Sequence, residues 1–289
     1  MQKKTIYAGL YGVEMTDNQF DLGEGIYVRK TYAHLFAPFM MAFKPPGKHK
    51  HHEGPWKAAK GGFSFDISAE IELPRTEIFD KLSGQEDGVW LIASLFRLSS
   101  YPFLNVPALS DISFNMIVDS TTEPSIYPFE IKHRIFGPPG KKIPFLSEDN
   151  LRWVKDHWMK TAELMVKYPK FYSAFKAFDS ATVQGRVSSS LLSIWGAIEQ
   201  LFSSNTGELK YRVSANLASY LTERGDKRLE LFKELSKLYN DRSTAAHTSK
   251  ELEHSPLISS FIHLRNALIK IVETGVMPTQ ESLEEIIFK

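Results

Sequence analysis

The sequence predicts an α+β fold, in which a β-rich amino-terminal half is followed by an all-α helical bundle. Of the 15 prolines, 12 precede Ser147, and so do 12 of the 17 glycines. Both residue types break helices and mark turns, so the first half should be rich in turns. Apolar residues in the first half often alternate with polar ones, whereas in the second half they recur every three or four positions. Strands and helices that do not alternate exclude a βαβ dinucleotide-binding unit.

The first half, residues 1–136, is predicted to be a β-rich domain such as a sandwich or a barrel. Phe63, Phe65, Ile67 and Ala69 alternate with polar residues, which is the pattern of a half-buried strand. Short apolar runs elsewhere predict strands near 5–15, 25–32, 88–96, 113–120 and 125–136. We assign this domain to sensing a trigger or guiding a substrate.

A linker and then helices are predicted for the rest of the chain. The segment FGPPGKKIPF holds three prolines and two glycines, so we place a linker at 137–146 and a helical domain at 147–289. Ser147 is a plausible N-cap, and the helix that follows should end at Pro169. Four more amphipathic helices are expected, around 192–201, 213–221, 232–238 and 261–271. Trp153 and Trp158, on the first helix, are expected to pack between the halves.

Composition excludes several classes of protein. The 289 residues are 43% hydrophobic and 24% charged, which is close to the globular average. There is no cysteine, which excludes disulfides and thiolate chemistry. No membrane-spanning run and no signal peptide are recognisable, so we expect a cytoplasmic protein without a membrane association. The net charge of +1 argues against non-specific duplex binding, and any nucleic-acid contact should therefore be local.

The most informative segment is LFKELSKLYNDRSTAAH, residues 231–247. A helix is expected to end near Tyr239, and a polar cluster with Arg242 and Ser243 follows it. His247 comes five residues after the arginine, so the pattern is Arg-x4-His. Two earlier segments, AIEQLF at 197–202 and GELKYRVSANLASYL at 207–221, complete an ordered set of three.

These three segments resemble the Apea-like subgroup of HEPN domains (higher eukaryotes and prokaryotes nucleotide-binding). The resemblance covers about Ala177 to Val272, and relatives often have glycine where this chain has Thr248. It implies a metal-independent endoribonuclease without cofactors, with Arg242 and His247 as catalytic residues and Ser243 and Tyr239 as supporting ones. It also implies a role in antiviral or abortive-infection defence, with a regulatory protein or a phage-derived trigger as a further partner. Glu199, in the first segment, is a candidate for orienting His247.

The residue types suit this chemistry. Attack of a ribose 2′-hydroxyl on the adjacent phosphate needs a base and then an acid, and imidazole serves both roles near neutral pH. An arginine fork can stabilise the charge that develops on the phosphate oxygens. On a straight helix, however, residues five apart diverge by about 140°. We therefore expect a homodimer, formed through the helical domain, in which two Arg242/His247 pairs face each other.

The lysine-rich segment Lys44–Lys60 is a second candidate site. Lys48, Lys50 and Lys57 could contact RNA phosphates or a protein partner, and Trp56 could stack on a base. A metal site at His49, His51 and His52 is a weaker reading because no second ligand cluster is apparent, and we predict no metal. The alternative to both kinds of site is that this segment is only a solvated loop between strands.

Two other functions stay open. The helical half could be a non-catalytic HEPN module that binds a nucleotide, RNA or a protein partner. Alternatively, the β-rich half could be the binding domain, and the helices could only dimerise.

Overall fold

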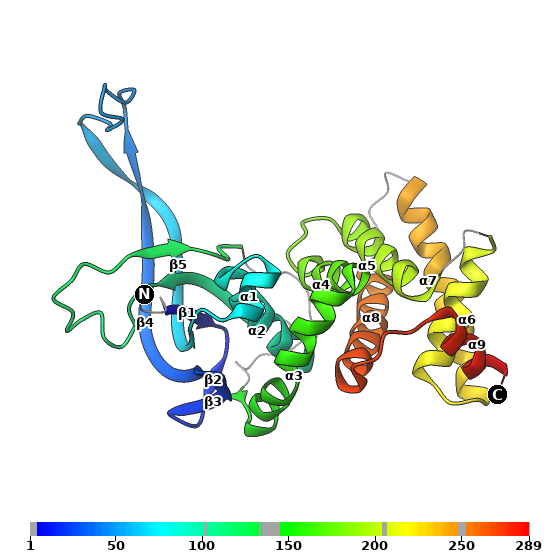
Figure 1. Ribbon diagram of the computed structural model, residues 1–289. Coiled ribbons are helices and arrows are strands. Elements are labelled where there is room, and N and C mark those ends of the chain that lie inside the picture. The colour runs from blue at the N-terminus through cyan, green and yellow to red at the C-terminus, as the bar shows by residue number, and fades with distance from the viewer. Residues whose placement is uncertain are drawn as a thin grey trace.

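A computed structural model describes residues 5–100, 103–132, 134, 145–203, 207–247 and 253–288. A curled antiparallel sheet forms the amino-terminal part and helices form the carboxy-terminal part, as the sequence predicts (Figure 1). Among the described residues, no helix is both long and apolar enough to cross a bilayer.

The sheet has six strands in the order β3-β4-β5-β1-β6-β7. Their bounds are β1 Ile6–Tyr11, β3 Gln19–Gly23, β4 Ile26–Ala42, β5 Trp56–Leu73, β6 Asn105–Ser110 and β7 Ile126–Pro128. All pairings within this sheet are antiparallel, and it is an open sheet instead of the expected sandwich or barrel. A second small sheet pairs β2 (Glu14–Met15) with β8 (Phe145–Leu146), so the predicted linker ends in a strand. The segment 137–144 lies outside the described residues.

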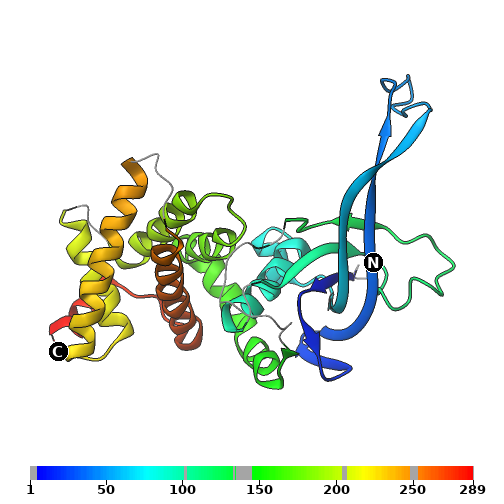
Figure 2. The same cartoon turned by 180° about the vertical axis from the view of Figure 1, so that it is seen from behind.

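Strands β4 and β5 extend far beyond the rest of the sheet as a two-stranded ribbon. We call residues 34–66 the arm; its paired region runs from His34 opposite Asp66 to Ala42 opposite Trp56. The arm projects away from the body in both views (Figures 1 and 2). Gly62 has φ +128°, and a Cβ atom there would come within 2.2 Å of the Ala37 carbonyl oxygen, so glycine permits the close approach of the two strands.

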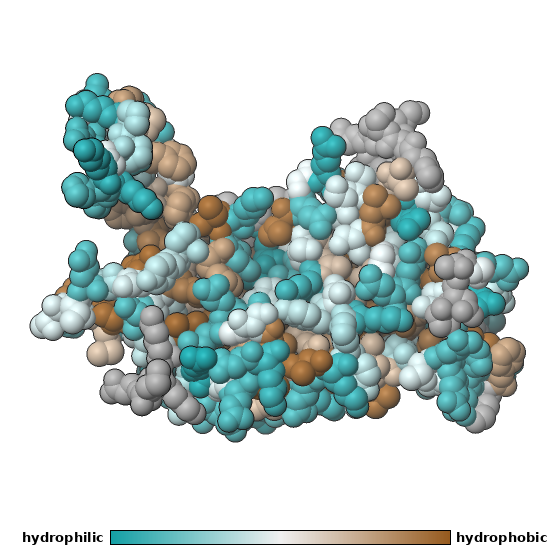
Figure 3. Space-filling model, turned by 45° about the horizontal axis from the view of Figure 1, so that its top comes forward, coloured by the Kyte–Doolittle hydropathy of each residue, from teal (hydrophilic) through white to brown (hydrophobic). Residues whose placement is uncertain are grey.

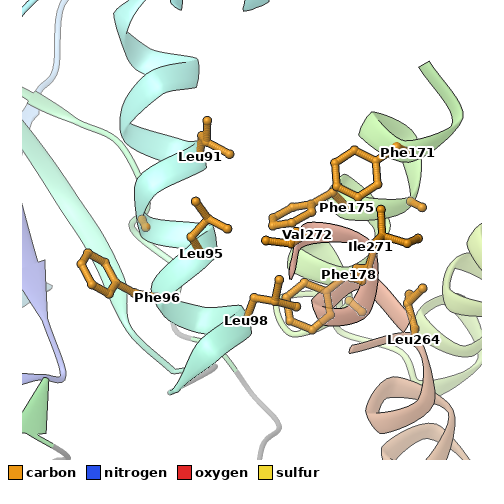
Figure 4. Close-up of a cluster of buried hydrophobic side chains, with 14 of the residues drawn as sticks. Leu91, Leu95, Phe96, Leu98, Phe171, Phe175, Phe178, Leu264, Ile271 and Val272 are labelled. Carbon is orange, nitrogen blue, oxygen red and sulfur yellow. The ribbon is translucent and has the colours of Figure 1, made fainter. Parts of the chain in front are cut away.

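The strand predicted at 88–96 is wrong, because this segment belongs to helix α2, Gln85–Ser99, which follows the short helix α1, Glu77–Leu82. Leu91, Leu95 and Leu98 face the helical half, and Phe96 points the other way, toward the sheet (Figure 4). The segment is buried on both sides and is apolar apart from Ser94, and such a run does not distinguish a strand from a helix. The strand predicted at 113–120 is also wrong, since that segment forms turns.

The helical half contains more helices than the five predicted. They are α3 Glu148–Lys167, α4 Pro169–Ala181, α5 Val187–Phe202, α6 Leu209–Leu221, α7 Asp226–His247, α8 His254–Thr274 and α9 Gln280–Phe288. Ser147 caps α3 as predicted: its side chain accepts a hydrogen bond from the Asn150 backbone N–H in a capping box. Pro169 follows the end of α3 and is also the first residue of α4. Proline is tolerated there because an N–H group at the first position of a helix has no carbonyl partner within the helix.

One hydrophobic core runs through both halves. Between α2, α4 and α8, Leu95, Phe175 and Val272 belong to the same cluster (Figure 4). Trp158 joins the halves as predicted, because its indole N–H donates to the Leu22 carbonyl oxygen at 2.9 Å. Trp153 is bonded within the helical half instead, to Glu273 at 3.1 Å.

A buried ionic network reinforces this junction. Asp179 on α4 accepts from Arg97 Nη1 on α2 at 2.9 Å and lies 3.3 Å from Arg134 Nη2. Glu130 pairs with the same two arginines. The halves are therefore joined by ionic as well as apolar contacts; the domain boundaries remain a prediction.

Candidate functional site

The Arg-x4-His pair lies on helix α7, which is continuous from Asp226 to His247. The sequence predicted that this helix ends near Tyr239, but it continues to His247. Asn240, Asp241 and Ser243 favour helix ends, but Ala245 is buried in the core beyond them. Tertiary packing therefore extends the helix by two turns beyond Tyr239.

This continuity determines how the two residues are placed. On an uninterrupted helix, the backbone positions of Arg242 and His247 differ by about 140° around the axis. The side chain of His247 lies outside the described part of the chain. The two positions thus lie on different faces of α7 within one copy of the protein.

Arg242 is anchored to helix α5 by Glu199. Its Nη2 lies 3.2 Å from Glu199 Oε1 and 3.5 Å from Oε2, and the two side chains are 27% and 18% exposed. Within the described chain, Arg242 Nε and Glu199 Oε1 are buried and lack a well-directed hydrogen bond. Both atoms are buried, so another group would reach this pair through the exposed part of the Arg242 side chain.

Tyr239 lies one turn before Arg242 and holds the other side of the guanidinium group. The Arg242 Cζ atom is 5.4 Å from the centroid of the Tyr239 ring. That ring meets the buried Trp195 edge-to-face at 5.3 Å, and the Trp195 indole N–H donates to Ser260 Oγ at 3.0 Å. Burial and then the negative charge of Glu199 raise the pKa of Tyr239, so the phenol stays protonated at neutral pH.

The structure thus brings together three of the predicted site residues, Glu199, Tyr239 and Arg242. Ser243 is half-buried beside Arg242 and lies about 100° further around the helix. Glu199 was expected to orient His247, whose side chain lies outside the described residues; the partners that the structure describes for Glu199 are Arg242 and Tyr239. No sequence pattern identified the pairing of Glu199 with Arg242, because the two residues are 43 positions apart.

The lysine-rich candidate residues lie elsewhere. Lys48, Lys50, Trp56 and Lys57 are exposed at and near the tip of the arm. The arm and α7 lie at opposite ends of the molecule in both views (Figures 1 and 2). A single copy therefore does not combine them with Arg242 into one site.

A hollow that sequence reasoning missed lies between α6 and α9. Its lining includes Ser203, Tyr211, Arg212, Asn216 and Glu284. Arg212 belongs to the second of the three sequence segments. The hollow depends on α9, which the sequence did not predict.

Within the described ranges, no group of three or more His, Asp or Glu side chains is arranged to hold a metal ion. Comparisons with protein-family models, curated proteins and solved structures found no match to this chain.

Proposed function

We propose that this protein is a metal-independent endoribonuclease of the HEPN type, with Arg242 and His247 as its catalytic residues. The observation that carries the proposal is the state of Arg242, which is partly exposed and held between Glu199 and Tyr239. An arginine held in this way is suited to meet a phosphate group. The identity of the reaction rests on the resemblance of the three sequence segments.

In the proposed reaction, the ribose 2′-oxygen bonds to the adjacent phosphorus and its proton passes to a basic imidazole of His247. The bond from phosphorus to the 5′-oxygen breaks, and that oxygen takes a proton from an imidazolium. The products are a 2′,3′-cyclic phosphate and a free 5′-hydroxyl. Arg242 stabilises the charge on the phosphate oxygens, while Glu199 and Tyr239 act as positioning residues.

The proposed site is shared between two copies. Because the positions of Arg242 and His247 diverge around the continuous helix α7, a second copy provides a simple way to aim both at one phosphate. We therefore propose a homodimer through the helical half. A role in antiviral or abortive-infection defence, with a phage-derived or protein trigger, belongs to the same proposal and rests on the resemblance.

The test is RNA cleavage by the purified protein in EDTA, with transfer RNA and unstructured strands as substrates. Cleavage with cyclic phosphate ends is expected. Arg242→Ala should lower the rate about 10²–10³-fold and His247→Ala about 10²–10⁴-fold. Arg152→Ala and His254→Ala change exposed residues outside the site and serve as matched controls. If all variants cleave as the wild type does, the assigned residues are wrong; if none cleaves and overexpression of wild type and variants is equally harmless to cells, the nuclease proposal fails.

One observation favours a second candidate, a non-catalytic HEPN module that binds a nucleotide, RNA or a protein partner. The carboxylate of Glu199 neutralises Arg242 and so reduces its ability to stabilise the extra charge of a phosphate transition state, which disfavours cleavage. A binding module would retain its function in His247→Ala, whereas a nuclease would lose its activity with little change in stability.

A further inference from the structure

The arm exposes an unusual number of large apolar side chains for a surface ribbon. Six of them are between 46% (Met41) and 69% (Phe36) exposed; the others are Phe39, Met40, Phe43 and Trp56. Two paired strands without a covering layer are only marginally stable in water. A patch of this kind marks a surface that binds something.

The pairing of the strands keeps these side chains uncovered. Phe36 lies opposite Ser64 and Met40 lies opposite Ala58, so β5 offers small residues across from these two large side chains of β4. In a regular stretch of a two-stranded ribbon, successive residues of a strand point to opposite faces, which places the consecutive and exposed Met40 and Met41 on different sides. Both faces of the arm are therefore available to a ligand.

The tip of the arm is held in shape by its own hydrogen bonds. The Trp56 indole N–H donates to the His52 carbonyl oxygen at 2.9 Å, and His52 Nδ1 lies 2.9 Å from the Lys44 carbonyl oxygen. The backbone N–H of Gly47 donates to the His51 carbonyl oxygen at 3.0 Å. The ring of Trp56 is thus fixed in position and still 58% exposed, as a stacking platform requires.

The arm also carries a net positive charge that the rest of the chain does not. Residues 34–66 contain five lysines against Glu53 and Asp66, a net charge of +3, although the whole chain carries only +1. The rest of the chain is therefore slightly negative. Figure 3 shows hydrophilic side chains at the end of the arm and more apolar ones along it.

We propose that the arm is a binding surface for single-stranded nucleic acid, separate from the Arg242 site. Phosphates contact lysines such as Lys48, Lys50 and Lys57, and unstacked bases lie on Trp56 and on the exposed phenylalanines. Every base has a flat face, so this combination of rings and lysines binds single strands with little sequence preference. A duplex hides its base faces and fits the exposed rings less well.

The distribution of charge argues against two other occupants. A ribbon enters a membrane with its tip first, and here the tip carries Lys48, Lys50 and Glu53, which would have to enter the hydrocarbon region. A second arm would bring another net charge of +3 against the first and would be repelled.

The proposal is tested with the full chain and a fluorescent 20-nucleotide 2′-O-methyl uridine strand. This probe lacks the 2′-hydroxyl nucleophile, so binding is measured whether or not the protein is a nuclease. The arm variant Lys48→Gln/Lys50→Gln/Lys57→Gln should weaken binding and reduce the slope of log K against log salt by about 2. Trp56→Ala should weaken binding about 5- to 100-fold. The control Lys81→Gln/Lys170→Gln/Lys227→Gln removes the same charge from exposed positions elsewhere and should bind as the wild type does.

Equal binding by the wild type and both arm variants would overturn the proposal. Two parallel measurements identify the rejected occupants. If the arm variants lose binding to phosphatidylserine vesicles and not to the strand, the surface binds membranes. If they change only the mass of the assembly measured by sedimentation, the surface binds a second copy of this chain. Circular dichroism of each variant shows that the body remains folded.

Discussion

Replacing Asp179 with asparagine should destabilise the protein by about 3–5 kcal/mol, the usual cost of breaking a buried ion pair. The Asp179 side chain is 8% exposed and faces Arg97 and Arg134, which are 1% and 2% exposed. It also accepts from the Trp90 indole N–H at 2.9 Å. The substitution keeps the shape but leaves two buried guanidinium groups facing Glu130 alone.

The effect should depend on pH. Burial alone would raise the pKa of Asp179, but the charges of Arg97 and Arg134 outweigh it and hold the pKa below its usual value. A lowered pKa in the folded state contributes stability above the unfolded pKa, near 3.9, and this is lost as the pH falls through the folded value. The wild type should therefore lose its advantage over Asp179→Asn in strong acid.

The assay is urea unfolding followed by circular dichroism, in which the midpoint changes at constant slope. Glu148→Gln is the matched control, because it removes a carboxylate from the exposed Glu148–Arg152 pair and should cost less than about 1 kcal/mol. If Asp179→Asn costs no more than this control at pH 7, the network does not stabilise the junction between the halves.

Three further predictions concern the site, the sheet and the arm. Mixing Arg242→Ala and His247→Ala subunits should restore about one quarter of wild-type cleavage, because half of the dimers are mixed and each of these has one complete site where a wild-type dimer has two. If no cleavage is recovered, Arg242 and His247 of one site come from the same copy. Burial raises the pKa of Glu70, so the wild type loses stability relative to Glu70→Gln as the pH rises from 4 to 7 and the buried carboxyl ionises. Urea unfolding midpoints at each pH measure this, and a difference in midpoint that does not change with pH would contradict the prediction. Gly62→Ala should speed proteolysis within the arm, because the added methyl meets the opposite backbone, whereas Gly185→Ala, which has open space, should not.

The limits of sequence reasoning are visible in particular elements. The run 88–96 is apolar apart from Ser94, so its period could not distinguish the buried helix α2 from a buried strand. Helix α4 was missed because Pro169 was taken as the end of one helix, although it also begins the next. At the candidate site, the sequence predicted that Arg242, Tyr239 and Glu199 belong to one site, and this stays a prediction; the pairing of Glu199 with Arg242 depends on how α5 and α7 pack.

The sequence by itself determined the order of the two halves, the capped start of α3 and the break at Pro169, because periodicity, caps and proline act over a few neighbouring residues. Only the tertiary structure decided that one core joins the halves, that Arg97 meets Asp179 from 82 positions away, and that β4 and β5 continue into an uncovered arm. These features arise from contacts between distant segments. Such contacts depend on how whole helices and strands pack, and no local pattern encodes that packing.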